Sequence, residues 1–309
     1  HNWIFSPRMS LETSVLYEYS EITQKGDVSK QRDFDFVKPK IDFRYDLTPT
    51  LQLRGIIEKV VQQLSFNDFV AATDNEDEDT NVQAGNANLR QEWYWNYEAN
   101  AEYRLPNDIG VVSGRIFYED WHDRIERLDV SPSEDVLQSA NGNIGDGIRY
   151  GLDVNGSIRM RMFDMPNLQI TGSLSAEDSE ITDPFLGIER RFLFTFRGRT
   201  TLGFRHDIPN WNLNYGVNWS NYFDGGRLRY DIDDIELSSG DPYWSSFVEW
   251  RGFNDITFRL DVRRFFNDGE NCRERQRFVG RISSGILEEI EDQCSSSGRS
   301  VSLSINGTF

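Results

Sequence analysis

The sequence lacks a long apolar run: no stretch approaches the ~18 continuous apolar residues of a membrane-spanning helix. Mean hydropathy is −0.60. Basic residues are also in the minority, with 33 Lys and Arg against 51 Asp and Glu and a formal net charge of −18. This excess of acid repels phosphate groups and argues against a nucleic-acid partner. The first residues, His1-Asn2-Trp3, show no basic segment followed by an apolar one, so no signal peptide is visible.

Histidine and cysteine are scarce as well. The three histidines are His1, His122 and His206, and only His122, beside Asp120 and Asp123, is a candidate for catalysis. No serine nucleophile motif accompanies it, so we expect a protein that is not an enzyme. The two cysteines, Cys272 and Cys294, have 21 residues between them and do not match a zinc-binding pattern.

Alternation of apolar and polar residues with a period of two recurs along the chain. It is clearest over residues 93–105, 150–162, 211–219 and 256–262. Several of these stretches approach or exceed the ~9–11 residues that a tilted strand needs to cross a bilayer. Their apolar positions are rich in Trp, Tyr and Phe, as in the aromatic girdles of membrane barrels. We therefore predict an all-β fold, an antiparallel transmembrane β-barrel with about twelve strands in this chain. The alternative is a soluble sandwich, whose strands usually hold only ~5–6 residues.

Short and long connections take turns between these strands. Tight turns are expected at 48–50, 106–108, 165–167, 209–210 and 253–255, and long polar loops at 65–91, 131–147, 224–241 and 269–298. Barrels with tight periplasmic turns and long extracellular loops have this layout.

The final strand alternates strictly. Val301, Leu303, Ile305 and Phe309 share one face, and serine, asparagine and threonine occupy the other. This resembles the terminal signal of bacterial outer-membrane proteins, in which the assembly machinery reads a last strand ending in Phe. The resemblance places Phe309 at the periplasmic rim and the long loops outside the cell.

Residues 85–92, Gly-Asn-Ala-Asn-Leu-Arg-Gln-Glu, resemble the G-N-P-x-L-x-P-E motif of TonB-dependent receptors, with Ala87 and Gln91 at the two proline positions. Further similarities to that family follow in order: Asn96-Tyr97-Glu98 with Glu102-Tyr103, then residues 117–125, then Tyr150-Gly151-Leu152-Asp153. Family members have an N-terminal plug and a barrel of about twenty-two strands. The resemblance implies that residues 1–309 are the C-terminal portion of such a barrel, without the plug and first strands. A complete twelve-stranded barrel is the alternative.

The same resemblance implies a location and partners. We expect an active-transport receptor in the outer membrane of a Gram-negative bacterium, driven by the TonB energy-transducing protein through an N-terminal region outside this chain. Its other partners would be outer-membrane lipid, the barrel-assembly machinery and a small-molecule ligand such as a siderophore, cobalamin or saccharide. No cofactor is expected. The runner-up function is a passive porin-like channel.

Three sets of residues are candidate sites. Lumen-facing arginines either guide an anionic ligand or form ion pairs along the wall; those singled out are Arg149, Arg159, Arg161, Arg197 and Arg199. Acidic runs either hold calcium, which prefers several converging carboxylates, or keep loops solvated; these are Asp74, Glu76, Asp77 and Asp79, and a second run from Asp231 to Glu236. A disulfide between Cys272 and Cys294, plausible after passage through an oxidising periplasm, would stabilise the last loop by roughly 3 kcal/mol.

Overall fold

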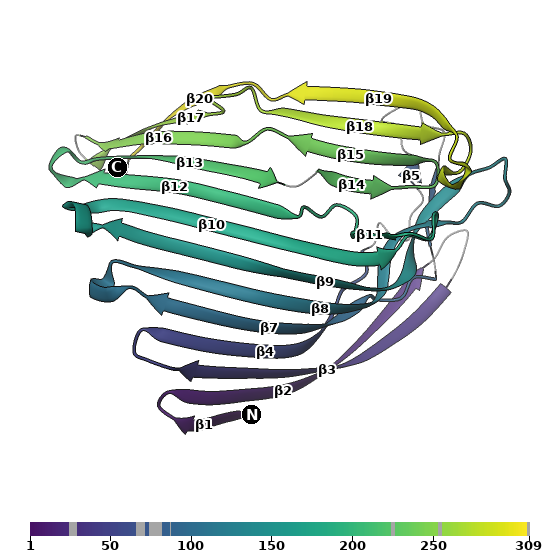
Figure 1. Ribbon diagram of the computed structural model, residues 1–309, viewed down its shortest axis with the longest axis horizontal. Coiled ribbons are helices and arrows are strands. Elements are labelled where there is room, and N and C mark those ends of the chain that lie inside the picture. The colour runs from purple at the N-terminus through teal and green to yellow at the C-terminus, as the bar shows by residue number, and fades with distance from the viewer. Residues whose placement is uncertain are drawn as a thin grey trace.

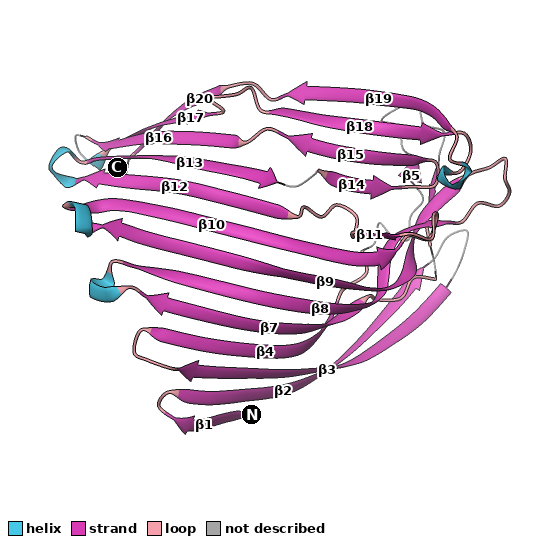
Figure 2. Cartoon of the chain, in the orientation of Figure 1, coloured by secondary structure: helices cyan, strands magenta, loops and turns pink. Residues whose placement is uncertain are grey.

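The computed structural model describes residues 1–24, 30–65, 72–73, 82–86, 88–223, 226–252 and 255–307 (Figure 1). Strands dominate, and the only helical segments in this part are single 3-10 turns (Figure 2). None of the described helices is long and apolar enough to cross a bilayer. Thirteen strands form one antiparallel path: β1 (Asn2–Ser6), β2 (Met9–Gln24), β3 (Lys30–Asp46), β4 (Leu51–Val61), β7 (Trp93–Arg104), β8 (Gly110–Asp129), β9 (Gln138–Met160), β10 (Met165–Thr182), β12 (Gly198–Ile208), β13 (Leu213–Phe223), β16 (Tyr243–Arg251), β17 (Thr257–Arg263) and β20 (Ser300–Asn306).

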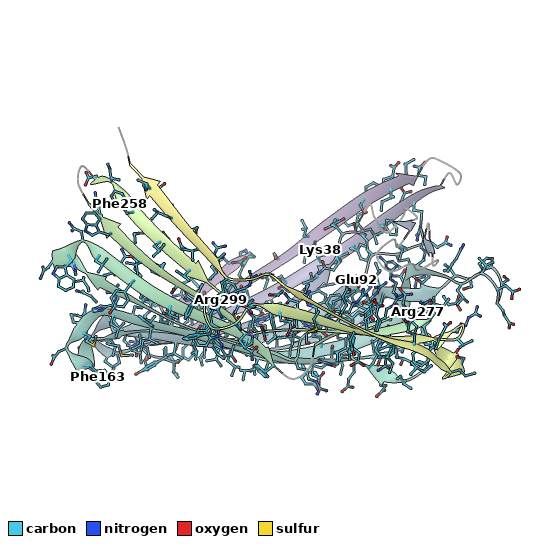
Figure 3. The ribbon with its side chains drawn as sticks, turned by 90° about the horizontal axis from the view of Figure 1, so that it is seen from above. Lys38, Glu92, Phe163, Phe258, Arg277 and Arg299 are labelled. Atoms are coloured by element: carbon cyan, nitrogen blue, oxygen red, sulfur yellow. A yellow bond between two sulfur atoms is a disulfide. The ribbon has the colours of Figure 1, made fainter. Side chains whose placement is uncertain are left out.

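The sheet is curved, and its edge strands β1 and β20 are not paired with each other in the described residues. Seen from above, the strands near both ends of the chain bend away from the middle strands to the same side (Figure 3). Three short strands join the sheet off the main path: β5 (Ala72–Thr73), β6 (Val82–Ala84) and β11 (Glu189–Arg190). The prediction of an all-β antiparallel fold is confirmed, and the expected number of strands is close to the thirteen on the main path.

One face of the sheet is apolar and uncovered. A row of directly paired residues crosses five strands, and every member is 40–46% exposed: Ile41, Ile57, Tyr97, Tyr118 and Tyr150. Further along the sheet, Ile116, Leu202 and Leu303 are 58%, 53% and 66% exposed. A soluble sandwich would bury such a face against a second layer. Here it is left open, as on a barrel surface that contacts hydrocarbon.

The opposite face carries ion pairs between neighbouring strands. Lys40 pairs with Glu58 at 3.3 Å, and Arg259 pairs with Glu249 at 3.1 Å. Because side chains alternate along a strand, this polar face lies on the other side of the same backbones. We call it the lumen face.

The tight connections lie together at one end of the sheet, the short-turn end, at the left of Figure 1. Three of them are 3-10 turns, at Pro106–Asp108, Arg161–Phe163 and Pro209–Trp211. They use Asn107, Asp164 and Asn212 at positive φ values of 59°, 58° and 50°. Asn and Asp tolerate the left-handed region better than most residues, which explains why these short sequences can reverse the chain.

The last strand also ends here, where Asn306 pairs with Thr257. Val301, Leu303 and Ile305 lie opposite Val262, Leu260 and Phe258 on the exposed apolar face. Phe309 lies outside the described residues.

The other end of the sheet, the long-loop end, differs from the prediction. Residues 131–147 were expected to be a loop, but β8 and β9 continue to Asp129 and from Gln138, so only a short connection remains. The loops expected at 224–241 and 269–298 form a second, four-stranded antiparallel sheet of β14 (Arg227–Tyr230), β15 (Asp234–Gly240), β18 (Glu270–Phe278) and β19 (Leu287–Ser296). Apolar residues pair only between β14 and β15, as Leu228 with Leu237 and Tyr230 with Ile235. On β18, Gln276 and Glu274 lie opposite Ile235 and Leu237, so no apolar face runs across the sheet to mark it in the sequence.

Candidate functional site

The segment resembling the receptor motif is anchored at the long-loop end. Leu89 is 0% exposed, and its carbonyl accepts a hydrogen bond from Arg32. The side chain of Asn143 on β9 accepts the backbone N–H of Arg90 at 2.8 Å and donates to the Arg90 carbonyl at 2.9 Å. The segment therefore crosses the extended strands β8 and β9, and leads into β7 at Trp93. Its described contacts hold backbone in place, which is a structural role.

In the middle of the lumen face, arginines are paired with carboxylates. Arg149, one of the predicted ligand residues, pairs with Glu119 at 3.3 Å and with Glu177 at 2.5 Å. Arg115 likewise contacts Glu98 at 2.7 Å and Asp153 at 2.9 Å. These arginines form the ion-paired wall that the sequence suggested as the alternative to a ligand site.

A ring separates the two arginines of this wall. Phe117 is buried, and the guanidinium groups of Arg115 and Arg149 lie 4.4 and 5.2 Å from its centroid. Gly151 makes room for it, since a Cβ there would lie 2.7 Å from ring atoms of Phe117. The middle of the wall thus combines packed apolar surface with paired charge.

The five predicted arginines do not converge. Arg161 belongs to the 3-10 turn at the short-turn end and donates to the Asn107 carbonyl at 3.4 Å, and Arg159 lines a hollow at the same end. Arg197 contacts Asp178 at 3.2 Å near the long-loop end. Arg199 lies over the ring of Tyr222 at 5.3 Å. Their joint role in ligand binding stays a prediction. Arg199 contacts Tyr222, which lines a larger cavity.

That cavity lies where the lumen face meets the four-stranded sheet. Its volume is about 490 Å³, within the range of small-molecule sites. On the wall side, Tyr222 pairs across the strands with Arg199, and Tyr243 with Ser220. On the far side it is lined by β15, β18 and β19 residues, including Ser239, Cys272 and Gln293. We call it the arginine pocket because Arg227, Arg264 and Arg273 line it.

Aromatic rings support the cations around this pocket. Phe196 and Tyr222 stack at 3.9 Å between centroids. The guanidinium of Arg227 lies 4.7 Å from the Phe196 ring, and that of Arg264 lies 5.7 Å from the Tyr243 ring. Such contacts hold a cation without neutralising it. Sequence reasoning did not single out Arg227 or Arg264, because neither lies in a stretch whose alternation is readable.

A disulfide closes one wall of the pocket. Cys272 on β18 lies directly opposite Cys294 on β19, and the two sulfur atoms are bonded. At the base of the hairpin, the Asp241 carboxylate accepts the backbone N–H of Glu270 at 3.0 Å. Both contacts tie strands of the four-stranded sheet together, so the pocket has a constrained outer wall.

The second acidic run is buried at the start of β15 in the same sheet. Asp231, Asp233, Asp234 and Glu236 are all at most 8% exposed. Arg275 donates to Asp234 at 2.7 Å, while Arg229 donates to Asp231 at 3.1 Å and to Glu236 at 3.3 Å.

Burial raises the pKa of the Asp234 carboxyl to about 7; Arg229 and Arg275 oppose the rise, and Glu236 and Asp231 add to it. This run therefore forms a core of ion pairs. The first run, with Asp74, Glu76, Asp77 and Asp79, lies outside the described residues, and calcium binding there stays a prediction.

His122, the candidate catalytic histidine, lies against a tryptophan ring and two carboxylates. Its ring stacks on Trp93 at 4.0 Å, and Asp120 and Asp146 lie 3.5 and 3.3 Å from its two nitrogen atoms. The other internal histidine, His206, contacts the Tyr215 hydroxyl at 3.0 Å.

Comparisons with known proteins agree with this architecture. A family model described as TonB dependent receptor-like, beta-barrel, matches residues 1–266. No curated protein matches the chain by sequence. Among solved structures, the chain is similar to the copper transporter OprC, with a TM-score of 0.73, 11% identity and coverage of 100% of this chain and 47% of that chain.

Two further structures are also similar. For the FrpB iron transporter from Neisseria meningitidis the TM-score is 0.63, with 13% identity over 98% of this chain and 43% of that chain. For the siderophore receptor PirA from Acinetobacter baumannii it is 0.59, with 13% identity over 98% and 44%. At these identities the likeness concerns the fold, and the chain spans less than half the length of each structure. With a family match over most of its residues, an uncovered apolar face and a charged lumen face, the chain belongs to the TonB-dependent receptor-like β-barrel family.

Proposed function

We propose that the protein is an active-transport receptor that takes up a scarce extracellular ligand across the outer membrane of a Gram-negative bacterium, with energy from the TonB system. Members of the family are transport proteins rather than enzymes. The observation that carries the proposal is the family match over residues 1–266, joined to a sheet whose apolar face is left open for lipid. The proposal places the short-turn end of the sheet on the periplasmic side of the membrane and the long-loop end outside the cell.

The proposed partners follow from that orientation. Outer-membrane lipid would contact the apolar face, and the barrel-assembly machinery would read the last strand with Val301, Leu303, Ile305 and Phe309. The remaining strands of the barrel, the plug and the region that meets TonB would belong to the part of the protein outside residues 1–309. The similar structures span more than twice this length, which supports that division.

Ligand capture would take place at the long-loop end. There the four-stranded sheet and the wall enclose the arginine pocket, whereas the middle of the wall is occupied by ion pairs such as Arg149 with Glu177. The similar solved structures include a copper transporter, an iron transporter and a siderophore receptor. A metal ion or metal chelate is therefore one candidate ligand class, beside cobalamin and saccharides.

Energy dependence tests this function. Cells that express the whole protein should accumulate one of three labelled probes: a ferric siderophore, cyanocobalamin or a maltooligosaccharide. Uptake should stop in a strain without TonB or after addition of a protonophore. Uptake that continues at the same rate in both conditions, together with steady conductance of the purified protein in planar bilayers, would instead establish the passive channel.

A further inference from the structure

We propose that the arginine pocket binds a small molecule through one or two carboxylate or phosphate groups, and that Arg227 and Arg264 bind these groups. This inference rests on the proposed function and narrows it: among the ligand classes open to the receptor, it selects those that present oxyanions at the pocket and not neutral saccharides.

The first support is the charge balance of the chain. With a net charge of −18, carboxylates are abundant enough to pair with most arginines. On the middle of the wall they do so, and Arg115, Arg149 and Arg259 each contact two carboxylates. In the four-stranded sheet, Arg229 of β14 and Arg275 of β18 are also paired with carboxylates. Several arginines without a carboxylate at one cavity are therefore informative where aromatic rings hold them in place.

The second support is the place of three arginines without a carboxylate partner. In the part of the chain that the structure describes, Arg199, Arg227 and Arg264 form no ion pair, and all three lie at or beside the arginine pocket. Arg8, Arg159 and Arg161 also form no ion pair there, but they lie at the short-turn end of the sheet. Arg191 and Arg263 form none either, and they do not line the pocket. The three at or beside the pocket come from different places: Arg199 from β12, Arg227 from the start of β14, and Arg264 from the residue after β17. Their convergence is a product of the fold.

The third support is the way these cations are held. Arg227, Phe196, Tyr222 and Arg199 form a layered set, with the two rings stacked at 3.9 Å and one guanidinium over each. A contact with a ring face uses none of the carboxylate-binding hydrogen bonds of a guanidinium, so its N–H groups stay available for a ligand. Those N–H groups match the geometry of carboxylate and phosphate oxygens and can bind them in pairs.

The pocket also contains acidic groups, which limit the charge of the ligand. Asp241 and Glu270 line it, and the Asp241 carboxylate is engaged by the backbone N–H of Glu270. Arg273 contacts Glu236 at 3.9 Å and Glu291 at 3.7 Å. The net charge of the side chains that line the pocket is therefore only slightly positive. This favours a ligand with one or two oxyanion groups over a polyanion.

Binding to the whole receptor in lipid nanodiscs tests the proposal. Calorimetry at physiological salt would use citrate as the carboxylate probe, pyrophosphate as the phosphate probe and sucrose as the neutral probe. We expect citrate or pyrophosphate to bind and sucrose not to bind. The probe that binds identifies which oxyanion the pocket takes.

Single substitutions then locate the site. Arg227→Gln and Arg264→Gln should each weaken binding of that anion by about tenfold or more, since a charged hydrogen bond is lost. The affinity of Arg227→Lys for the anion should lie between those of wild type and Arg227→Gln, because lysine keeps the charge and loses the planar guanidinium. Arg251→Gln is the matched control: Arg251 pairs with Asp255 at the short-turn end and is 63% exposed, so its loss should leave affinity unchanged.

Two results would overturn the proposal. One is binding of neither anion above the sucrose signal. The other is anion binding that both glutamine variants retain, in protein whose hydrogen-exchange pattern shows an intact four-stranded sheet. Neither measurement needs TonB, so the two proposals fail separately. TonB-independent uptake would refute active transport alone, whereas TonB-driven uptake of a neutral ligand without anion binding would refute only the pocket assignment.

Discussion

Glu92 and Arg124 join the end of the motif segment to strand β8. Nη1 of Arg124 lies 3.0 and 3.1 Å from the two carboxylate oxygens of Glu92, and one of these oxygens also accepts the backbone N–H of Ile125 at 2.8 Å. The side chains are only 13% and 19% exposed. A carboxylate that satisfies both a cation and a main-chain donor fixes the segment against the strand at the point where β7 begins.

Glu92→Ala should therefore loosen this junction by about 2 kcal/mol, the cost of leaving a charged donor and an amide without their acceptor. Hydrogen exchange at residues 88–92 and 124–126 would measure the loss. Glu92→Gln should lose less, because its amide oxygen can still accept from Ile125. Equal exchange in wild type and Glu92→Ala would contradict the anchoring role.

Removing Arg190 should destabilise the fold more than removing Glu92, because the ion pairs of Arg190 are almost fully buried. It donates to Glu126 and to Asp183, each at 2.7 Å, and the three side chains are at most 4% exposed. Arg190→Ala leaves the buried carboxylate of Asp183 without its cation and leaves Glu126 with only the more distant Arg124, at 3.5 Å. Removing one partner from a buried ion pair typically costs ~3–5 kcal/mol. Limited proteolysis of the 183–195 segment should become faster. If cleavage is no faster than in wild type, the network is not holding this segment.

The membrane face can be tested with two neighbouring positions on β12. Leu202 is 53% exposed on the apolar face, whereas Thr201 contacts Ser173 at 2.5 Å on the lumen face. Arginine near the bilayer midplane on a lipid-facing position costs ~2–4 kcal/mol. Leu202→Arg should therefore lower stability in lipid vesicles, measured by urea titration, well below that of Thr201→Arg. A reversed order would mean that the two faces are assigned the wrong way round.

Asp234 should make the four-stranded sheet sensitive to pH. Its pKa is about 7 in the fold against an ordinary value of 3.8, so the folded state holds more protons between these values than the unfolded state. The contribution to stability is full at low pH, declines by about 1.4 kcal/mol per pH unit as pH rises toward 7, and is constant above that.

Asp234→Asn removes this dependence. The difference in hydrogen-exchange protection of β15 and β18 between wild type and variant should change between pH 5 and pH 7, in the direction of a weaker wild type, and then level off. A difference that stays constant over the whole range would show that Asp234 does not titrate between pH 5 and pH 7.

The strands of the wall could be predicted in detail because their signal is local. Backbone geometry sends successive side chains to opposite faces, so a strand between hydrocarbon and water must alternate. Leu152 and Val154 therefore reveal their face regardless of their neighbours. The turn at Asn107 was also readable, since few residue types accept its backbone conformation.

The strands of the four-stranded sheet could not be predicted in this way. Their apolar face covers only β14 and β15, and charged side chains of the other strands pair with one another, as Arg275 does with Asp234. An ion pair of this kind depends on which strands are neighbours and in what register, and residue types alone do not specify either.

The sequence by itself determined the fold class, the two faces of the wall and the family, because period-two alternation and the spaced motif residues act over a few neighbouring positions. Only the tertiary structure decided which arginines are neutralised and which are available. Arg149 was an obvious candidate and lies between two carboxylates, whereas Arg227 and Arg264, 37 residues apart, meet at one pocket. The physical reason is that electrostatic partners are set by distance in space, and strand register and hairpin packing bring distant residues within that distance.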